Sequence, residues 1–232
     1  DSPNDLLLDY SSKEIENKLR FENTSTLKNN YKLNVGIGLE NATYTNSTFQ
    51  RLAISDGVQE IDFSSKLSML KYNLFGQISK KYLNAKLGVS IGFRLDALDY
   101  NSEMKNPLNQ FSPRVSLSYK LSEKISLNAS TGIYNQLPAY TILGYRNNLN
   151  ELVNRNNGLK FIEATHYVSG FELNPNTTSK ISLEGFYKAY KKYPFSVRDQ
   201  ISLANLGSDF GVIGNEEVTS TSKGRSYGIE LL

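Results

Sequence analysis

Residues 14–40 read EIENKLRFENTSTLKNNYKLNVGIGLE, and this stretch decides the fold class because apolar and polar side chains alternate along both of its halves. In residues 14–22 the odd positions are mainly apolar and the even positions are all charged. In residues 31–40 the odd positions are apolar again, and the positions between them are polar or glycine. A period of two residues is typical of a β-strand with unlike faces. The stretch therefore predicts two strands.

A tight hairpin joins the two predicted strands at residues 28–30, which read Lys-Asn-Asn. Asparagine tolerates the positive φ angles that a tight hairpin turn requires. A three-residue loop at this position keeps both faces in register, which a wrong loop length would destroy. The expected cross-strand pairs are Leu27 with Tyr31, Phe21 with Ile37, Leu19 with Leu39 and Lys18 with Glu40.

The same alternation recurs along the chain and predicts an all-β fold, an antiparallel meander of about nine long strands. The connections alternate in length: short turns are expected near 28–30, 79–82, 122–124 and 174–179, and long Asn/Ser/Gly-rich loops near 47–61, 98–110, 136–162 and 198–223. The strand candidates are 13–27, 31–46, 62–78, 83–97, 111–121, 125–135, 163–173, 180–197 and 224–232.

Long strands with alternating short and long connections are typical of a transmembrane β-barrel of the outer membrane. A soluble sandwich uses shorter strands and more even connections. Strands of ~9–11 residues suffice to cross a bilayer at a tilt. The polar face carries Glu, Lys, Arg, Asn and Ser, which suits a wet or filled lumen with lipid outside. The opposite orientation, with a dry apolar interior, remains the alternative that periodicity alone does not separate.

Composition excludes several classes of protein. The chain has 232 residues, a formal net charge of +3, 39% hydrophobic residues, one His and no Cys. It is too apolar for wholesale disorder, and it lacks the ~20-residue apolar run of a membrane helix. It has no thiolate ligand, no second His and no basic footprint for nucleic acid, so neither a metal nor another cofactor is expected. Paired carboxylates such as Glu14 and Glu16 alternate with Lys and Arg, and they favour a charge ladder over a catalytic pair.

The loop 136–162 is the most site-like segment, because it mixes aromatic, aliphatic and basic residues. Loops of this kind contact ligands or partners. The alternative is a loop that folds over the barrel mouth for structural reasons, and the sequence leaves both readings open. The candidate ligand-facing residues of the loop are Tyr140, Tyr145, Arg146, Arg155 and Lys160.

The second half of the chain resembles TonB-dependent receptors, especially the Bacteroidetes type. Three blocks carry the resemblance. They are YNQLP (134–138) running into LGYR (143–146), EGFYK (184–188) running into YPFS (193–196), and ANLG (204–207) through Gly214-Asn215 to GRSYGIE (224–230). The last block is similar to a strand start that recurs in these barrels. Before about residue 111 the resemblance rests on the strand pattern alone.

The resemblance implies a segment of a larger barrel in the bacterial outer membrane, with a plug domain inside it. It implies an active importer of a large, scarce solute such as a metal chelate, cobalamin or a glycan, driven by TonB through the plug. Arg20, Arg94 and Arg114 would then contact the plug or line the solute path. Lipid surrounds such a barrel, and a surface lipoprotein is a further partner that some of these barrels use. Residues 1–232 are accordingly expected to form one partial β-barrel domain, cut from a longer chain, without the plug and the closing strands.

Two other functions remain open at this stage. A passive outer-membrane porin or adhesin-like barrel would have the same wall and need no plug. A soluble all-β binding module would turn the apolar face inward. An enzyme is not expected, because no nucleophile–base pair or metal set is present in the sequence.

Overall fold

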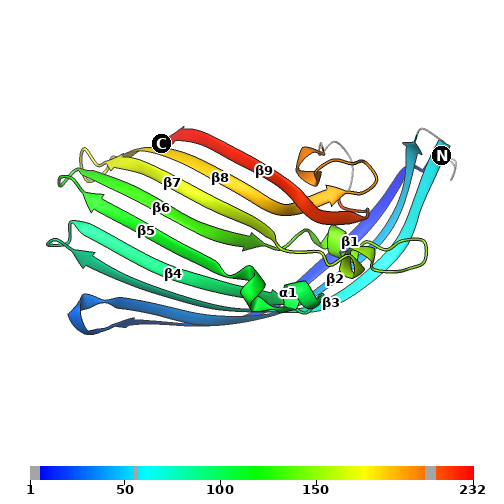
Figure 1. Ribbon diagram of the computed structural model, residues 1–232, viewed down its shortest axis with the longest axis horizontal. Helices are drawn as coiled ribbons and strands as arrows, with labels where there is room; N and C mark the ends of the chain where they lie inside the picture. Colours follow the sequence, from blue (N-terminus) through cyan, green and yellow to red (C-terminus); the bar gives the residue numbers. More distant parts are fainter. Residues whose placement is uncertain (1–5, 55–56, 207–212) are drawn as a thin grey trace.

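The computed structural model describes residues 6–54, 57–206 and 213–232, which form one curved antiparallel sheet (Figure 1). The nine strands pair in the order of the sequence, so the predicted meander is confirmed. Short turns lie at one end of the sheet and the longer connections lie at the other end. The strands are β1 (Leu8–Thr26), β2 (Lys32–Ile54), β3 (Gly57–Tyr82), β4 (Leu87–Leu98), β5 (Ser112–Lys120), β6 (Ile125–Gln136), β7 (Ile162–Leu173), β8 (Ile181–Ser196) and β9 (Val218–Leu231).

The first hairpin has the register that the sequence predicts. Phe21 pairs with Ile37, Leu19 with Leu39, and Lys18 with Glu40. The short 3-10 turn η2 (Lys28–Asn30) closes the hairpin, with φ of 59° at both asparagines. Asparagine supplies this left-handed backbone at small steric cost, and the register of every outward and inward side chain on β1 and β2 follows from the turn.

Three connections differ from the prediction. The expected long loop 47–61 is wrong, because β2 continues to Ile54 and β3 begins at Gly57; residues 55–56 lie outside the described residues. The expected turn at 79–82 is also wrong, because β3 runs on to Tyr82 and the chain turns over residues 83–86 instead. Leu83 has a positive φ of 54°, which the apolar alternation of the sequence does not reveal. The expected loop 198–223 ends earlier, at β9, and its residues 207–212 lie outside the described residues.

One face of the sheet is an exposed apolar belt. On β3 the belt runs from Leu70 to Ile78, and β2 contributes the odd residues from Leu33 to Leu39. Beyond this belt, toward the long connections, the same face turns polar at Thr43 and Ser68. The belt matches the apolar band, ~25 Å tall, by which barrels face lipid. Its exposed side chains include Leu19, Phe21, Ile37, Leu39, Leu74, Ile91, Phe93, Leu117, Leu127, Phe171 and Ile229.

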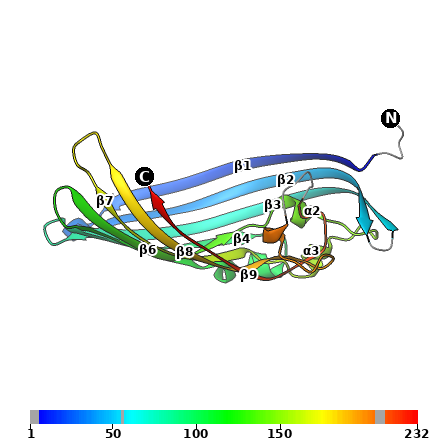
Figure 2. The same ribbon diagram turned by 90° about the horizontal axis from the view of Figure 1, so that it is seen from above.

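The opposite face is concave and polar near the short turns, and it holds the loops at the other end (Figure 2). Small helices α1 (Ser102–Lys105), α2 (Tyr140–Gly144) and α3 (Val153–Asn156) and the 3-10 turns η3 (Pro107–Gln110) and η4 (Leu203–Asn205) belong to these loops. We call the segments 99–111, 137–161, 197–206 and 213–217 the loop cap. The cap packs on β2, β3 and β4 through the buried residues Ala42, Tyr44, Leu67, Met69, Leu98, Tyr100, Met104, Tyr140, Ile142, Leu143, Leu159, Phe161, Leu203 and Val218.

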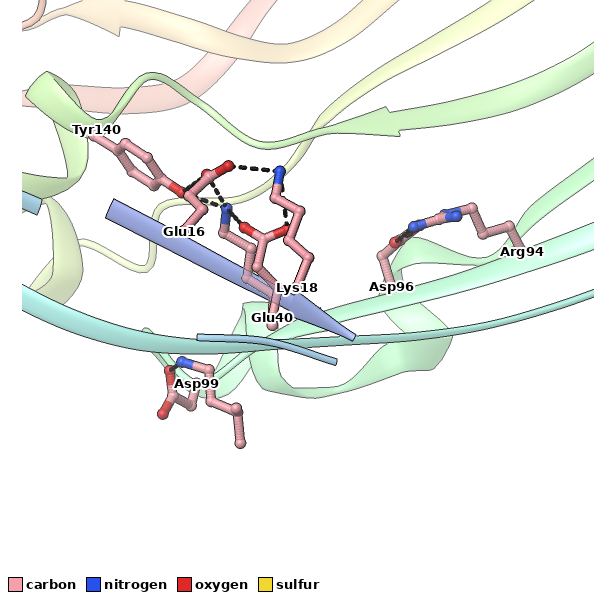
Figure 3. Close-up of polar contacts among 9 residues, drawn as sticks. Glu16, Lys18, Glu40, Arg94, Asp96, Asp99 and Tyr140 are labelled. Carbon is pink, nitrogen blue, oxygen red and sulfur yellow. Dashed lines mark hydrogen bonds and ion pairs between the residues drawn. The ribbon is translucent and has the colours of Figure 1, made fainter. Parts of the chain in front are cut away.

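The sheet is taller at β1–β3 than at β4 and β5. Pairing between β2 and β3 extends to Ile54 and Gly57, whereas β4 leaves β3 at Leu98. Asp99 marks this end, since its carboxylate accepts a hydrogen bond from the Leu70 backbone N–H at 2.7 Å (Figure 3). Above Asp99 the inner face of the tall sector is free of β4 and receives the loop cap.

The loop-covered inner wall as candidate functional site

A charged cluster on the inner wall meets the loop cap at the base of the cap. Glu16 and Lys18 come from β1, Glu40 from β2 and Lys71 from β3, and Tyr140 reaches them from α2 (Figure 3). Lys18, Glu40 and Lys71 lie side by side in the strand register. Their period-two alternation with the apolar belt places all four charges on the concave face. We call these five residues the wall–loop cluster.

The wall–loop cluster is a closed network of opposite charges. Lys71 contacts Glu16 at 3.0 Å, and its Nζ also donates to Glu40 and to the Tyr140 hydroxyl. Lys18 contacts Glu16 at 2.5 Å and Glu40 at 3.4 Å, which confirms the predicted Lys18–Glu40 pairing. Two lysines thus balance two glutamates, and the network is electrically neutral. A neutral network of this kind holds its own side chains in place and has no net charge with which to attract a free ion.

Tyr140 joins the network to the apolar core of the cap. Its hydroxyl donates to Glu16 at 2.6 Å, and its ring lies 5.6 Å from the ring of Tyr44. Burial, together with the hydrogen bond to Glu16, raises the pKa of Tyr140 to about 12, despite the opposing effect of Lys71. The phenol is therefore neutral at physiological pH and serves as a donor to the wall.

Asn154 is a buried polar link inside the cap. Its side-chain amide donates to the carbonyls of Ile142 at 2.8 Å and Glu216 at 3.0 Å, and its oxygen accepts from the Val218 N–H at 2.8 Å. The side chain is fully buried. One residue of α3 thereby satisfies backbone groups of α2 and of the segment that leads into β9, which joins two long connections into one body.

The predicted loop residues all make contacts within the protein. Tyr145 packs edge-on against Phe63 with ring centroids 5.6 Å apart. Arg146 donates to Ser65 at 3.3 Å, so both residues rest on the inner face of β3.

The other two predicted loop residues are basic and lie further along the loop. Arg155 sits 6.0 Å from the ring centroid of Tyr100, and Lys160 pairs with Glu103 at 3.5 Å. These contacts show how the loop is held in place. They leave its role toward a ligand as a prediction.

The three predicted lumenal arginines lie on the inner wall, but the structure does not bring them together. Arg20 binds Glu22 at 2.6 Å. Arg94 binds Asp96 through contacts of 2.7 to 2.9 Å. Arg114 lies over the ring of Tyr134, 4.3 Å from its centroid.

Glycines on the inner wall make room for bulky neighbours. A Cβ on Gly132 would lie 2.9 Å from Cγ of Arg114, so the glycine leaves room for that side chain. A Cβ on Gly36 would lie only 2.3 Å from Cζ of Phe75. At these two positions the absence of a Cβ therefore accommodates the side chain of the neighbouring residue.

Below the charged residues, toward the short turns, the inner wall is lined by small hydroxyl side chains. Ser79, Ser90, Ser116 and Ser130 follow one another across β3, β4, β5 and β6 in the register. They line a hollow of about 870 Å³ on the concave side. The short side chains leave the space next to this wall open for another body of protein or for solute.

Within the described ranges, no group of three or more His, Asp or Glu residues is placed to hold a metal ion. The ring of His166 stacks on the ring of Tyr134, with the two centroids 4.4 Å apart. No helix of the described segments is long and apolar enough to span a membrane.

Sequence reasoning missed Lys71 and Asn154 and treated Glu16 only as part of a charge ladder. The alternation of β3 places Lys71 on the polar face. With the register of β3 against β2 known, this position would have indicated Lys71 as the partner of Glu40. Asn154 lies in a loop without any period, so no signal in the sequence marks it as buried.

Comparison with known proteins shows which family this architecture belongs to. The profile of the family described as "TonB dependent receptor-like, beta-barrel" matches residues 2–232. No curated protein matches the chain. Among solved structures, the copper transporter OprC aligns with a TM-score of 0.65 at 19% identity, over 99% of this chain and 36% of that one.

Two further structures are similar to the chain. The ferripyoverdine receptor of the outer membrane of Pseudomonas aeruginosa has a TM-score of 0.63 at 14% identity, over 97% of this chain and 31% of that one. The siderophore receptor PirA from the same organism has a TM-score of 0.61 at 16% identity, over 95% and 37%. The chain thus spans about a third of the length of the structures it matches, and at these identities the likeness shows the fold.

Proposed function

Because the chain belongs to the TonB-dependent receptor-like β-barrel family, we propose that it forms part of the wall and the external loops of an active importer. The family consists of receptors of the bacterial outer membrane and not of enzymes, so the apolar belt faces lipid and the concave face is the lumen. The imported solute is large and scarce, of the class of metal chelates, cobalamin-like compounds, glycans or peptides.

The observation that carries the proposal is the combination of the two faces with the loop cap. The belt on the convex side is apolar and exposed, the concave side carries Glu16, Glu40 and Lys71, and Tyr140 ties the cap to them. A wall of this kind suits a lumen that is wet and occupied, and a cap over the mouth suits selection of a solute.

The partners follow from the same proposal. A plug domain, encoded elsewhere in the protein, occupies the hollow beside Ser90 and Ser116, and TonB acts through that plug. Residues 1–232 are then one partial β-barrel domain of the protein. A surface lipoprotein over the cap is an additional partner in this proposal.

The loop residues that the sequence singled out divide into two groups under this proposal. Tyr140 holds the cap, while Tyr145, Arg146, Arg155 and Lys160 shape the part of the cap that meets solute. Arg20, Arg94 and Arg114 line the lumen, and their pairing with wall neighbours makes them fixed contacts for the plug or the passing solute.

The test uses the intact receptor in cells that have or lack TonB. Accumulation is measured for a panel of labelled probes: iron chelated by a catecholate siderophore, copper ion, cyanocobalamin and a linear oligosaccharide. We expect one probe to accumulate only with TonB and a proton gradient. Equal uptake without TonB would contradict the proposal and favour a passive porin.

A second measurement keeps the result decisive if none of the probes is the solute. The intact receptor is inserted into a planar lipid bilayer and its ionic conductance is recorded. A plugged importer is closed to ions, whereas a porin shows steady open-channel current. A steady open current from the intact receptor would overturn the importer proposal.

A further inference from the structure

The outer face of β1–β3 changes character just beyond the apolar belt. Ile15 is the last apolar residue of the belt on β1, and it pairs with Thr43, which pairs with Ser68 on β3. The next outward row consists of Lys13, Thr45 and Lys66, and Thr45 pairs with both lysines. Two cations therefore flank a threonine directly above the lipid-facing surface.

Both lysines are available for a ligand. Their side chains are exposed to solvent. Within the described residues, neither Lys13 nor Lys66 makes an ion pair, whereas Lys192 on β8 binds Glu163 at 2.9 Å. On β1 and β3 the nearest carboxylates along this outer face belong to Asp9 and Asp62, two rows and ~14 Å further from the belt. On the belt side, Asp99 stands opposite Leu70, two rows from Lys66, and its carboxylate accepts the Leu70 backbone N–H.

The surroundings of the two lysines are rich in hydroxyl groups. The row beyond them consists of Ser11, Ser47 and Ser64, which pair with one another. Hydroxyl groups donate hydrogen bonds to phosphate oxygens and to sugars. The two lysines stand two strands apart, or ~10 Å, so their flexible side chains can reach one phosphate group together or one each.

We propose that Lys13 and Lys66, with the hydroxyls around Thr45, bind phosphate groups of lipids in the outer leaflet of the membrane. Two observations select this occupant. The patch is continuous with the belt that faces lipid, and it lies on the side of the long loops, which is the external side of such barrels. Its charge is complementary to phosphate, and basic residues next to a membrane bind anionic head groups at this level. The proposal holds for an importer and for a porin alike.

The experiment measures the lipid that stays bound to the intact barrel. The protein is extracted from cells in mild detergent and washed, and the phosphorylated glycolipid of the outer leaflet, lipid A, is quantified per barrel by mass spectrometry. The test variant is K13Q/K66Q. We expect it to retain about five-fold less lipid A for each lysine removed. Retention equal to that of the unaltered barrel would overturn the proposal.

A matched control removes the same charge elsewhere. Lys28 and Lys124 are exposed and lie in short turns at the opposite end of the sheet. The K28Q/K124Q variant is expected to retain lipid A fully, because that end does not meet the outer leaflet. An equal loss in both variants would mean that overall charge, and not the patch, retains the lipid, and it would also overturn the proposal.

An add-back step separates phosphate recognition from contact with acyl chains. Delipidated barrel is mixed with lipid A that carries both phosphates, or with the same lipid after dephosphorylation. We expect binding of the phosphorylated form only, and loss of that preference in K13Q/K66Q. Equal binding of both forms would assign the retention to the apolar belt and contradict a phosphate site. Competition by inorganic phosphate at moderate concentration would point to the free anion as the ligand, which would also contradict the lipid assignment.

Discussion

The Tyr140 hydroxyl donates a hydrogen bond to the Glu16 carboxylate at 2.6 Å across 124 positions of sequence. This contact ties the loop cap to β1, while the apolar packing of the cap is on β2, β3 and β4. Because Glu16 also binds Lys71 and Lys18, the cap is attached to a network that spans β1 to β3. The contact therefore couples the position of the longest described loop to the wall of the lumen.

Replacing Tyr140 with Phe removes the hydroxyl and keeps the ring against Tyr44. We expect the attachment of the cap to weaken by about 1–3 kcal/mol, because the charged Glu16–Lys71 pair loses a shared hydrogen-bonding partner. Hydrogen–deuterium exchange of the intact barrel should show faster exchange in α2 with unchanged exchange in β2 and β3. Tyr119→Phe, which alters an exposed ring on the outer wall, is the control and should change nothing. Unchanged exchange in α2 would show that packing alone holds the cap.

The raised pKa of Tyr140 predicts a response to alkaline pH. Its pKa is about 12 in the folded protein, above the ordinary value of 10.0. A raised folded pKa means that the contribution to stability is complete below pH 10 and is lost as the pH rises toward 12. Absorbance at the tyrosinate band, taken as the difference between the native barrel and Tyr140→Phe, should show one tyrosine that titrates in this upper range. A difference spectrum that is complete near pH 10 would contradict the buried, Glu16-bound phenol.

Replacing Asn154 with Ala should release two parts of the cap together. The substitution leaves the carbonyls of Ile142 and Glu216 and the N–H of Val218 without partners. We expect a loss of about 3 kcal/mol in the local stability of the cap. Limited proteolysis of the intact barrel should cut segment 137–161 more rapidly. Asn156→Ala, an exposed change in the same helix, is the control, and equal cleavage of the two variants would count against the buried link.

Gly36 should not tolerate even a methyl group. A Cβ at this position would lie 2.3 Å from Cζ of Phe75 and 2.8 Å from the Phe21 carbonyl oxygen. We expect Gly36→Ala to destabilise the barrel by about 1–3 kcal/mol, since backbone atoms as well as the ring must move. The urea midpoint of the refolded barrel measures this. Gly88→Ala, where the nearest atom is 3.8 Å away, is the matched control and should unfold at the unaltered midpoint.

The orientation of the sheet predicts that an arginine substitution changes barrel stability differently on the two faces of β3. Leu74 lies in the middle of the apolar belt, and Leu74→Arg should destabilise the barrel in lipid by about 2–4 kcal/mol. Gln77→Arg, on the inner face of the same strand, should be tolerated, because that face is wet. Unfolding in lipid vesicles measures both. A reversed order of the two effects would mean that the apolar face points inward.

The sequence predicted those parts of the fold in which the two faces have different environments. The hairpin register follows from Leu19 and Leu39 on the apolar convex face and Lys18 and Glu40 on the polar concave face, because a slip of one residue would exchange them. Beyond the belt both faces of β2 are rich in polar residues. The part of β2 that contains Thr43 and Ser47 therefore resembles a loop in composition, and its end was predicted as one. The turn at 83–86 was misplaced for the opposite reason, since Leu83 continues an apolar pattern while its backbone is left-handed.

The candidate site was predicted in part. Tyr140 was singled out by its loop, and the structure gives it a partner in Glu16 that no local pattern names. The predicted arginines lie on the wall as expected, but each is engaged by a near neighbour, such as Asp96 for Arg94. Contacts between distant segments depend on which strands are neighbours and on how far each strand is shifted along the next. Local sequence patterns do not specify these two features.

The unequal height of the sheet has a consequence for recognition from outside the cell. The strands β2 and β3 project on one side as far as Ile54 and Gly57, whereas the pairing of β4 with β5 on the next side extends only to Arg94 and Ser112. Large bodies such as antibodies, which cannot enter the mouth, would meet this projecting edge first. A compact solute can approach over the lower side. The taller edge of the sheet would thus serve as an epitope, while the approach to the concave face lies beside it.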